Sequence, residues 1–126
     1  MVATLRKRLA HDEGGFTLIE LLVVLVIIGI LLAIAVPSYL GFKDRANLRA
    51  AQANVRAAVP SAEAYFSDNN TYVGMTNGTL KAIDSGLSTS LTVSGASATA
   101  YCLQDTVGGK AAHASGPGGK TTKNAC

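Results

Sequence analysis

Residues 15–40 read GFTLIELLVVLVIIGILLAIAVPSYL, and a charge-free run extends from Leu21 to Phe42. About 20 apolar residues in a helix are enough to cross a bilayer. A short polar leader with a basic cluster at residues 6–8 precedes this run, and the positive-inside rule keeps such a segment in the cytoplasm. We therefore expect one membrane-spanning helix with a cytoplasmic N-terminus, and an extracytoplasmic chain from about residue 43.

The overall composition restricts the classes of protein that need to be considered. Of the 126 residues, 48% are hydrophobic and 15% are charged, against about 25% charged in an ordinary soluble domain. The net charge of +3 is too mild for nucleic acid as the main partner. With two cysteines and two histidines, the chain offers no ordinary metal cluster. We expect neither a metal nor a cofactor.

Two simple interpretations of the apolar run leave one residue unexplained. A secretory signal peptide could be cut after Ala35, although Pro37 directly behind that site disfavours the cut. A plain membrane anchor is the other simple interpretation. Neither interpretation explains why Glu20 is present. An unpaired carboxylate carried to the bilayer centre costs about 2.5–3.5 kcal/mol, and neither a signal peptide nor a plain anchor needs one.

The quoted stretch resembles the N-terminal signature of type IV pilins and type II secretion pseudopilins. The resemblance implies an α+β fold, in which a long N-terminal helix packs its C-terminal half on a small antiparallel β-sheet. It implies that a prepilin peptidase cuts between Gly15 and Phe16, and that Phe16 is then N-methylated. Gly29 and Pro37 fall where such helices kink, and Pro37 also lacks a backbone donor.

The chemistry of Glu20 fits this resemblance. Cleavage would create an amine at Phe16, four residues earlier and on the same helix face. In a filament core, the Glu20 carboxylate could instead reach the amine of a neighbouring subunit. An unpartnered buried charge destabilises by about 3–5 kcal/mol. We therefore expect Phe16 and Glu20 to act in filament assembly, the alternative being a tolerated interfacial carboxylate in a plain anchor.

Beyond the apolar run, residues 43–66 are predicted to continue the helix with two stripes. The apolar stripe, expected to dock a sheet, contains Leu48, Ala51, Val55, Val59, Ala62 and Phe66. The second stripe contains Arg45, Arg49, Gln52, Arg56 and Glu63. The simple interpretation of this second stripe is a solvated face, while small alanine side chains on the remaining surface would allow neighbouring helices to approach closely. Pro60 either kinks the helix or ends it.

Residues 67–126 are predicted to form the head. Short alternating runs at residues 91–93 and 99–103, separated by glycine-rich turns, indicate an antiparallel meander lying on the helix. Oxygen-bearing side chains at residues 68–71 could bind calcium, but their spacing favours helix capping or a turn.

Cys102 and Cys126 both fall on the oxidising side of the predicted topology, which favours a disulfide. Closing this loop would stabilise the fold by about 3.5 kcal/mol in the chain-entropy model. The arrangement resembles the disulfide-bounded C-terminal region of many type IV pilins. Two free thiols are the alternative.

Enzymatic motifs fail on inspection. The segment at residues 118–121 ends like a phosphate-binding loop, but Ala114 stands where the first glycine is required. His113 has no nearby acid or nucleophile in the sequence. We expect no catalytic residues.

These observations predict the major pilin of a type IV pilus, a homopolymer serving adhesion, twitching motility or DNA uptake. The expected parts are a cleaved leader (1–15), a transmembrane and filament-core helix (16–42), its amphipathic continuation (43–66) and a head (67–126). The subunit would reside in the cytoplasmic membrane before assembly and in a surface filament afterwards.

The expected partners follow from the same interpretation. They are the prepilin peptidase, an inner-membrane assembly platform and, indirectly, assembly and retraction ATPases; DNA would be met through the fibre only. Two alternatives stay open. One is the major pseudopilin of a type II secretion or competence system, and the other is a membrane-tethered minor tip adhesin.

Overall fold

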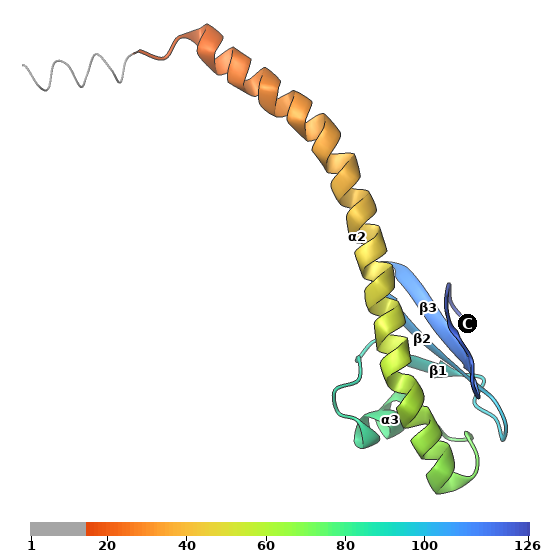
Figure 1. Cartoon of the computed structure of the whole chain (residues 1–126). Helices are drawn as coiled ribbons and strands as arrows, with labels where there is room; N and C mark the ends of the chain where they lie inside the picture. Colours follow the sequence, from red (N-terminus) through yellow and green to blue (C-terminus); the bar gives the residue numbers. More distant parts are fainter. Residues whose placement is uncertain (1–14) are drawn as a thin grey trace, which may run out of the picture. The chain divides into compact units, whose positions relative to one another are not determined.

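The computed structural model describes residues 15–126, and a single helix, α2 (Leu18–Asn69, 52 residues), occupies much of that range. The chain divides into two compact units, the first ending at Leu40 and the second extending from Gly41 to Cys126. Figure 1 shows these elements along the chain. The predicted leader lies outside the described residues except for Gly15.

In the first unit, the described residues form an extended segment followed by helix α2. Residues 15–17 are non-helical, and the helix then runs without interruption to the end of the unit. Gly29 and Pro37 both lie within continuous helix. A kink at these two positions stays a prediction.

The second unit is built from the rest of α2, one short helix and a sheet. Helix α3 spans Asn77–Ile83, and the strands are β1 (Thr92–Ser94), β2 (Tyr101–Val107), β3 (Lys110–Gly116) and β4 (Thr121–Lys123). The sheet order is β1-β2-β3-β4 with every neighbouring pair antiparallel, and α2 passes over this sheet (Figure 1). The α+β fold with a small antiparallel meander is therefore confirmed.

The core lies between the sheet and one stripe of α2. Along β2 and β3, alternate residues are buried, which is the period of a sheet with one covered face. Small side chains on both layers bring helix and sheet close together. The buried residues of these layers are Ala51, Val55, Ala58 and Ala62 on α2, and Tyr101, Leu103, Ala112 and Ala114 on the strands.

The helix differs from its predicted course at its end and at one stripe. It passes through Pro60 and ends at Asn69, three residues beyond the predicted end. Pro60 lies on the exposed side of the helix, where solvent can bind the backbone carbonyl that the missing proline N–H leaves free. The predicted charged stripe is wrong at Gln52, which is buried, and Glu63 is half-buried.

The sheet contains elements that the sequence pattern did not reveal. Strand β2 is longer than the predicted run at 99–103, and β3 had no prediction. A two-residue turn joins them, in which Gly108 and Gly109 have φ of 54° and 80°. Positive φ at both positions fits the tight hairpin turns that favour glycine. Helix α3 was likewise missed, although Thr76 and Thr79 form a capping box at its start.

Candidate functional site: an uncovered apolar helix and a locked head

Helix α2 begins with a reciprocal pair of hydrogen bonds. The Thr17 backbone N–H donates to Glu20 Oε2 at 3.2 Å, and the Glu20 backbone N–H donates to Thr17 Oγ1 at 3.3 Å. This is a capping box, which satisfies two backbone donors that a helix start leaves free. The T-x-x-E spacing was a readable signal for it. Glu20 therefore has a local role in addition to any contact with a neighbour.

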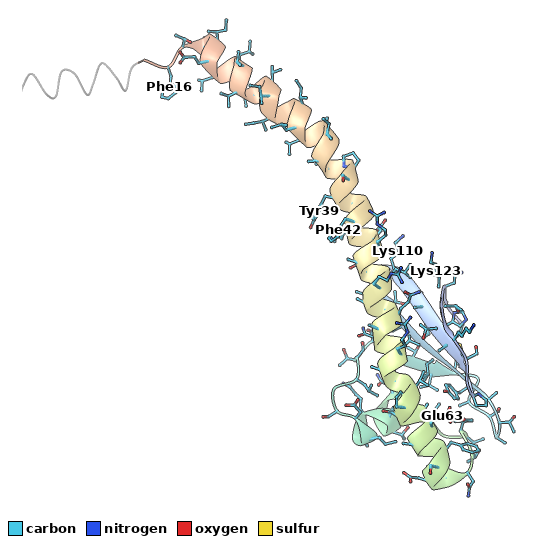
Figure 2. All side chains as sticks on the ribbon, viewed as in Figure 1. Phe16, Tyr39, Phe42, Glu63, Lys110 and Lys123 are labelled. Atoms are coloured by element: carbon cyan, nitrogen blue, oxygen red, sulfur yellow. A yellow bond between two sulfur atoms is a disulfide. The ribbon has the colours of Figure 1, made fainter. Side chains whose placement is uncertain are left out.

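The predicted cleavage point lies immediately before this cap. Gly15 and Phe16 are outside the helix, and the Phe16 side chain is 77% exposed (labelled in Figure 2). A non-helical, exposed segment is the form in which a peptidase can bind a peptide bond. The geometry is compatible with cleavage between these two residues.

The apolar section of α2 is exposed on every side. Every large apolar side chain from Phe16 to Phe42 is exposed, and this stretch reaches a mean hydropathy of 3.2 over 18 residues. Apolar patches larger than a few hundred Å² are rare on monomeric soluble proteins and mark surfaces that bind protein or membrane. Among residues 15–126 this is the one helix long and apolar enough to cross a membrane.

In the head, one carboxylate on α2 holds two tyrosines. Glu63 accepts hydrogen bonds from the hydroxyls of Tyr72 and Tyr101, each at 3.1 Å, and the two rings lie 4.6 Å apart. Burial, followed by the bonded carboxylate, raises the pKa of Tyr72 above its ordinary value of 10.0. The same causes raise the pKa of Tyr101. Both phenols therefore stay protonated and continue to donate.

A second carboxylate, Asp105 on β2, is almost fully buried. Asn54 of α2 donates its side-chain amide to Asp105 Oδ2 at 2.6 Å, and the Ser90 hydroxyl donates to Oδ1. A buried carboxylate is tolerated when such donors replace water. Asp105 therefore joins the helix, the sheet and the loop before β1.

Cys102 on β2 and Cys126 form a disulfide, with their Cα atoms 6.2 Å apart. The Cys126 N–H also donates to the side-chain oxygen of Gln104 at 3.0 Å. Both contacts tie the segment after β4 back to the middle of the sheet. Within residues 15–126 no cysteine is free.

The remaining candidate ligands have structural partners. His113 Nδ1 lies 2.8 Å from the Asn124 carbonyl oxygen, which places its ring over β4. The Asn69 amide donates to the Tyr65 carbonyl at 2.9 Å, and Asn70 adopts a positive φ of 55° as α2 ends. Across the described range, no group of three or more His, Cys, Asp or Glu side chains could hold a metal ion.

Comparison with known proteins places the chain among filament subunits. The prokaryotic N-terminal methylation motif matches residues 11–36. The type IV wide pilus major component PilA4 of Thermus thermophilus is 39% identical over 98 residues, covering 74% of this chain and 72% of the relative. The chain belongs to the family of type IV pilins and pseudopilins.

Two further members of this family match over shorter lengths. The type IV major pilin protein PilA of Myxococcus xanthus is 38% identical over 71 residues, covering 56% of this chain and 32% of the relative. The type II secretion system core protein G of Pseudomonas aeruginosa is 39% identical over 62 residues, covering 49% of this chain and 44% of the relative. The chain thus spans less than half the length of these two relatives.

Membership in the pilin and pseudopilin family explains why the apolar section of α2 is exposed. Subunits of this family are structural, are processed by a prepilin peptidase and polymerise. The apolar section of α2 is suited both to membrane anchoring and to a filament, because it offers an apolar surface in all directions. In the head, Glu63, Asp105 and the disulfide each join segments that lie far apart in the sequence.

Proposed function

We propose that this pilin-type subunit is the major pilin of a type IV pilus. The similarity to the Thermus thermophilus pilus component carries the proposal. The match covers 74% of this chain, which is longer than the stretch from residue 1 to the end of α2 at Asn69. The match therefore extends into the head. The protein G relative is matched over 49% of the chain, a length that the leader and helix can account for.

The proposed sequence of events begins in the membrane. Residues 16–42 insert into the cytoplasmic membrane with the N-terminus inside, and the residues from 43 onward lie outside. A prepilin peptidase removes residues 1–15, and the new N-terminus at Phe16 is methylated. An assembly platform, driven indirectly by ATPases, then moves the subunit into a surface fibre that acts in adhesion, motility or DNA uptake.

Lipid already covers the apolar helix, so the hydrophobic effect alone does not drive the subunit out of the membrane. Packing against other copies must replace the lipid contacts, and a specific polar contact must select the register. We propose that the Glu20 carboxylate pairs with the Phe16 amine of a neighbouring subunit. Loss of one partner would leave a buried charge, at a cost of about 3–5 kcal/mol.

The second candidate is the major pseudopilin of a type II secretion system. It is favoured by relatives named as core protein G, whose identity to this chain over their matched lengths is similar to that of the pilins. Electron microscopy of cells with and without the protein separates the two. A major pilin gives long surface fibres that disappear with the protein, whereas absence of fibres at normal expression favours the pseudopilin.

Processing is tested by the mass and first residue of the mature protein. The proposal predicts methylated Phe16 as the N-terminus. A mature chain that begins at Val36 would identify a cleaved signal peptide, and the filament proposal would then be wrong, because most of the apolar helix would be gone.

The two roles of Glu20 are separable. Glu20→Gln keeps the capping box, because an amide oxygen can still accept from Thr17, but it removes the charge. Thr17→Val removes the hydroxyl of the cap and keeps the carboxylate. We expect Glu20→Gln to be inserted and cleaved normally but to yield few fibres, while Thr17→Val assembles. Normal fibres from Glu20→Gln together with failure of Thr17→Val would show that the cap, and not the charge pair, is required.

A further inference from the structure

Five cations of the second unit lie near the start of that unit's part of α2 or at the strand end that pairs with it. They form what we call the basic collar: Lys43, Arg45, Arg49, Lys110 and Lys123. The first three lie on α2 just past Phe42, and all three are exposed. The other two come from β3 and β4, far away in sequence, so the fold itself assembles the collar.

The two strand lysines are placed by the sheet register. Lys123 pairs with Ala112, and Lys110 lies two residues from Ala112 on β3, so both side chains are on the face that packs on α2. Figure 2 labels both lysines at the same end of the sheet, beside the helix. Lys110 Nζ lies 3.7 Å from Asp44 Oδ2, which fixes its level along α2.

A hollow of about 370 Å³ opens between these lysines and the helix. Leu48, Gly109, Lys110 and Lys123 contribute to its lining, and the lining contains no carboxylate among the described residues. The hollow therefore places two flexible cations beside an apolar wall, which suits the phosphate and glycerol of a lipid headgroup.

Nearby acids leave the collar strongly positive. Asp44 is a single carboxylate among five cations. Glu63 and Asp105 are occupied by tyrosine, amide and hydroxyl donors inside the head. Asp68 lies near the other end of α2, about 36 Å along the helix axis from Asp44 at about 1.5 Å per residue.

Along the chain, the collar begins directly after the apolar run, at Lys43. From Phe42 to Leu48 is about 9 Å of helix at about 1.5 Å per residue, and each headgroup layer of a bilayer is about 5–8 Å thick. We propose that the basic collar binds the phosphates of anionic phospholipids in the outer leaflet while the subunit waits in the membrane. This inference rests on the membrane stage of the proposed function. Assembly would then have to strip these lipids from the subunit.

The experiment uses the full chain in nanodiscs of equal phosphatidylglycerol and phosphatidylcholine, with the retained lipids counted by native mass spectrometry. We expect the wild type to retain phosphatidylglycerol preferentially. The double variant Lys110→Gln/Lys123→Gln should reduce this preference about tenfold or more, since each cation near an anionic surface contributes severalfold. The control Lys81→Gln/Lys120→Gln removes equal charge outside the collar and should leave the preference unchanged.

Each outcome decides the proposal. Equal retention of the two lipids by the wild type, or equal loss of preference in both double variants, overturns the collar. A collar variant that keeps its lipid preference but loses fibres identifies the surface as a contact with carboxylates of a second copy, which also overturns it. Membrane insertion is measured separately by alkaline extraction. Failure of the wild type to insert would contradict the membrane stage itself, whereas insertion without lipid preference contradicts only the collar.

Discussion

The two sections of helix α2 differ in how their apolar side chains are covered. From Leu18 to Phe42, Leu, Ile and Val cover all sides, and every large apolar side chain is exposed. From Lys43 to Asn69, a narrow stripe of Ala and Val is buried under the sheet, and charged residues occupy other faces. A helix that is apolar all round needs an apolar environment all round, whereas a striped helix needs one partner. The first section is therefore built for lipid or for several neighbours, and the second for its own head.

The head has a thin apolar core, and polar contacts and a disulfide add to its stability. Its helix and β3 contribute mostly Ala to the contact, so the apolar area is small. Glu63 with its two tyrosines and Asp105 with its donors connect the helix to the rest of the head, and the disulfide ties the segment after β4 back to β2. The apolar section of α2 has no comparable internal contacts, since its stabilising partners must come from outside the chain.

The largest contrast is expected from removing one leucine in each region. Leu103→Ala deletes a fully buried side chain, which costs about 2–5 kcal/mol, whereas Leu31 is 60% exposed. We expect Leu103→Ala to destabilise the head strongly and Leu31→Ala to leave it unchanged. Denaturant unfolding of the full chain in detergent, followed by near-UV tyrosine circular dichroism, measures both. Equal changes in the unfolding free energy of the head in the two variants would contradict the distinction between the buried and the exposed region.

The disulfide should affect the head almost as much. Replacing Cys102 and Cys126 together by Ser removes a cross-link between residues 24 apart in sequence, which is worth about 3.5 kcal/mol in the chain-entropy model. We expect a lower unfolding free energy with normal membrane insertion. A double variant as stable as the wild type would mean that the Gln104 contact and β4 hold the segment without the cross-link.

The hydrogen bonds from the buried Tyr72 and Tyr101 side chains to Glu63 predict that the head loses stability at alkaline pH. The pKa values of Tyr72 and Tyr101 are raised in the folded state, so the folded head retains protons that the unfolded chain releases above about pH 10. The stabilisation is complete below pH 10 and declines above it by up to about 1.4 kcal/mol per pH unit for each tyrosine. Unfolding free energies at pH 9 and pH 11 should show this slope, and Tyr72→Phe should reduce it. An unchanged slope in that variant would exclude Tyr72 as its source.

The smallest effect is expected from Lys110→Gln. Its ion pair with Asp44 is exposed on both sides, and such pairs contribute between zero and about 1 kcal/mol. We expect the unfolding free energy of the head to change by less than about 0.5 kcal/mol, as measured by the same denaturant method. A loss above 2 kcal/mol would show that Lys110 supports the fold, and its lipid test would then need Lys123→Gln alone.

The long helix and the antiparallel meander could be predicted from the sequence, because each follows from a simple pattern of apolar residues. The unbroken apolar run predicted the exposed helix, and alternation with glycine turns predicted the meander. Strand β3 was missed because Lys110–Gly116 is rich in Ala and contains Gly, residues with weak strand preference, and only pairing with β2 makes it a strand. Helix α3 was missed because it is short and depends on its Thr76 cap.

The site was readable in part. The resemblance to pilins singled out Gly15, Phe16 and Glu20, whose roles in cleavage and assembly stay predictions. The capping partner Thr17 could have been found from the T-x-x-E spacing. The role of Glu63 could not be found, because its partners Tyr72 and Tyr101 are brought to it by tertiary folding. The same holds for the basic collar, whose strand lysines reach α2 only through the register of the sheet.

A helical reconstruction of fibres made by this protein tests the central claim most directly. The account predicts that residues 18–42 pack against other copies at the centre of the fibre without lipid around them, while the stripe from Ala51 to Ala62 stays under its own sheet. A fibre whose subunits lack residues 16–35, or whose apolar section remains surrounded by lipid, would contradict the account.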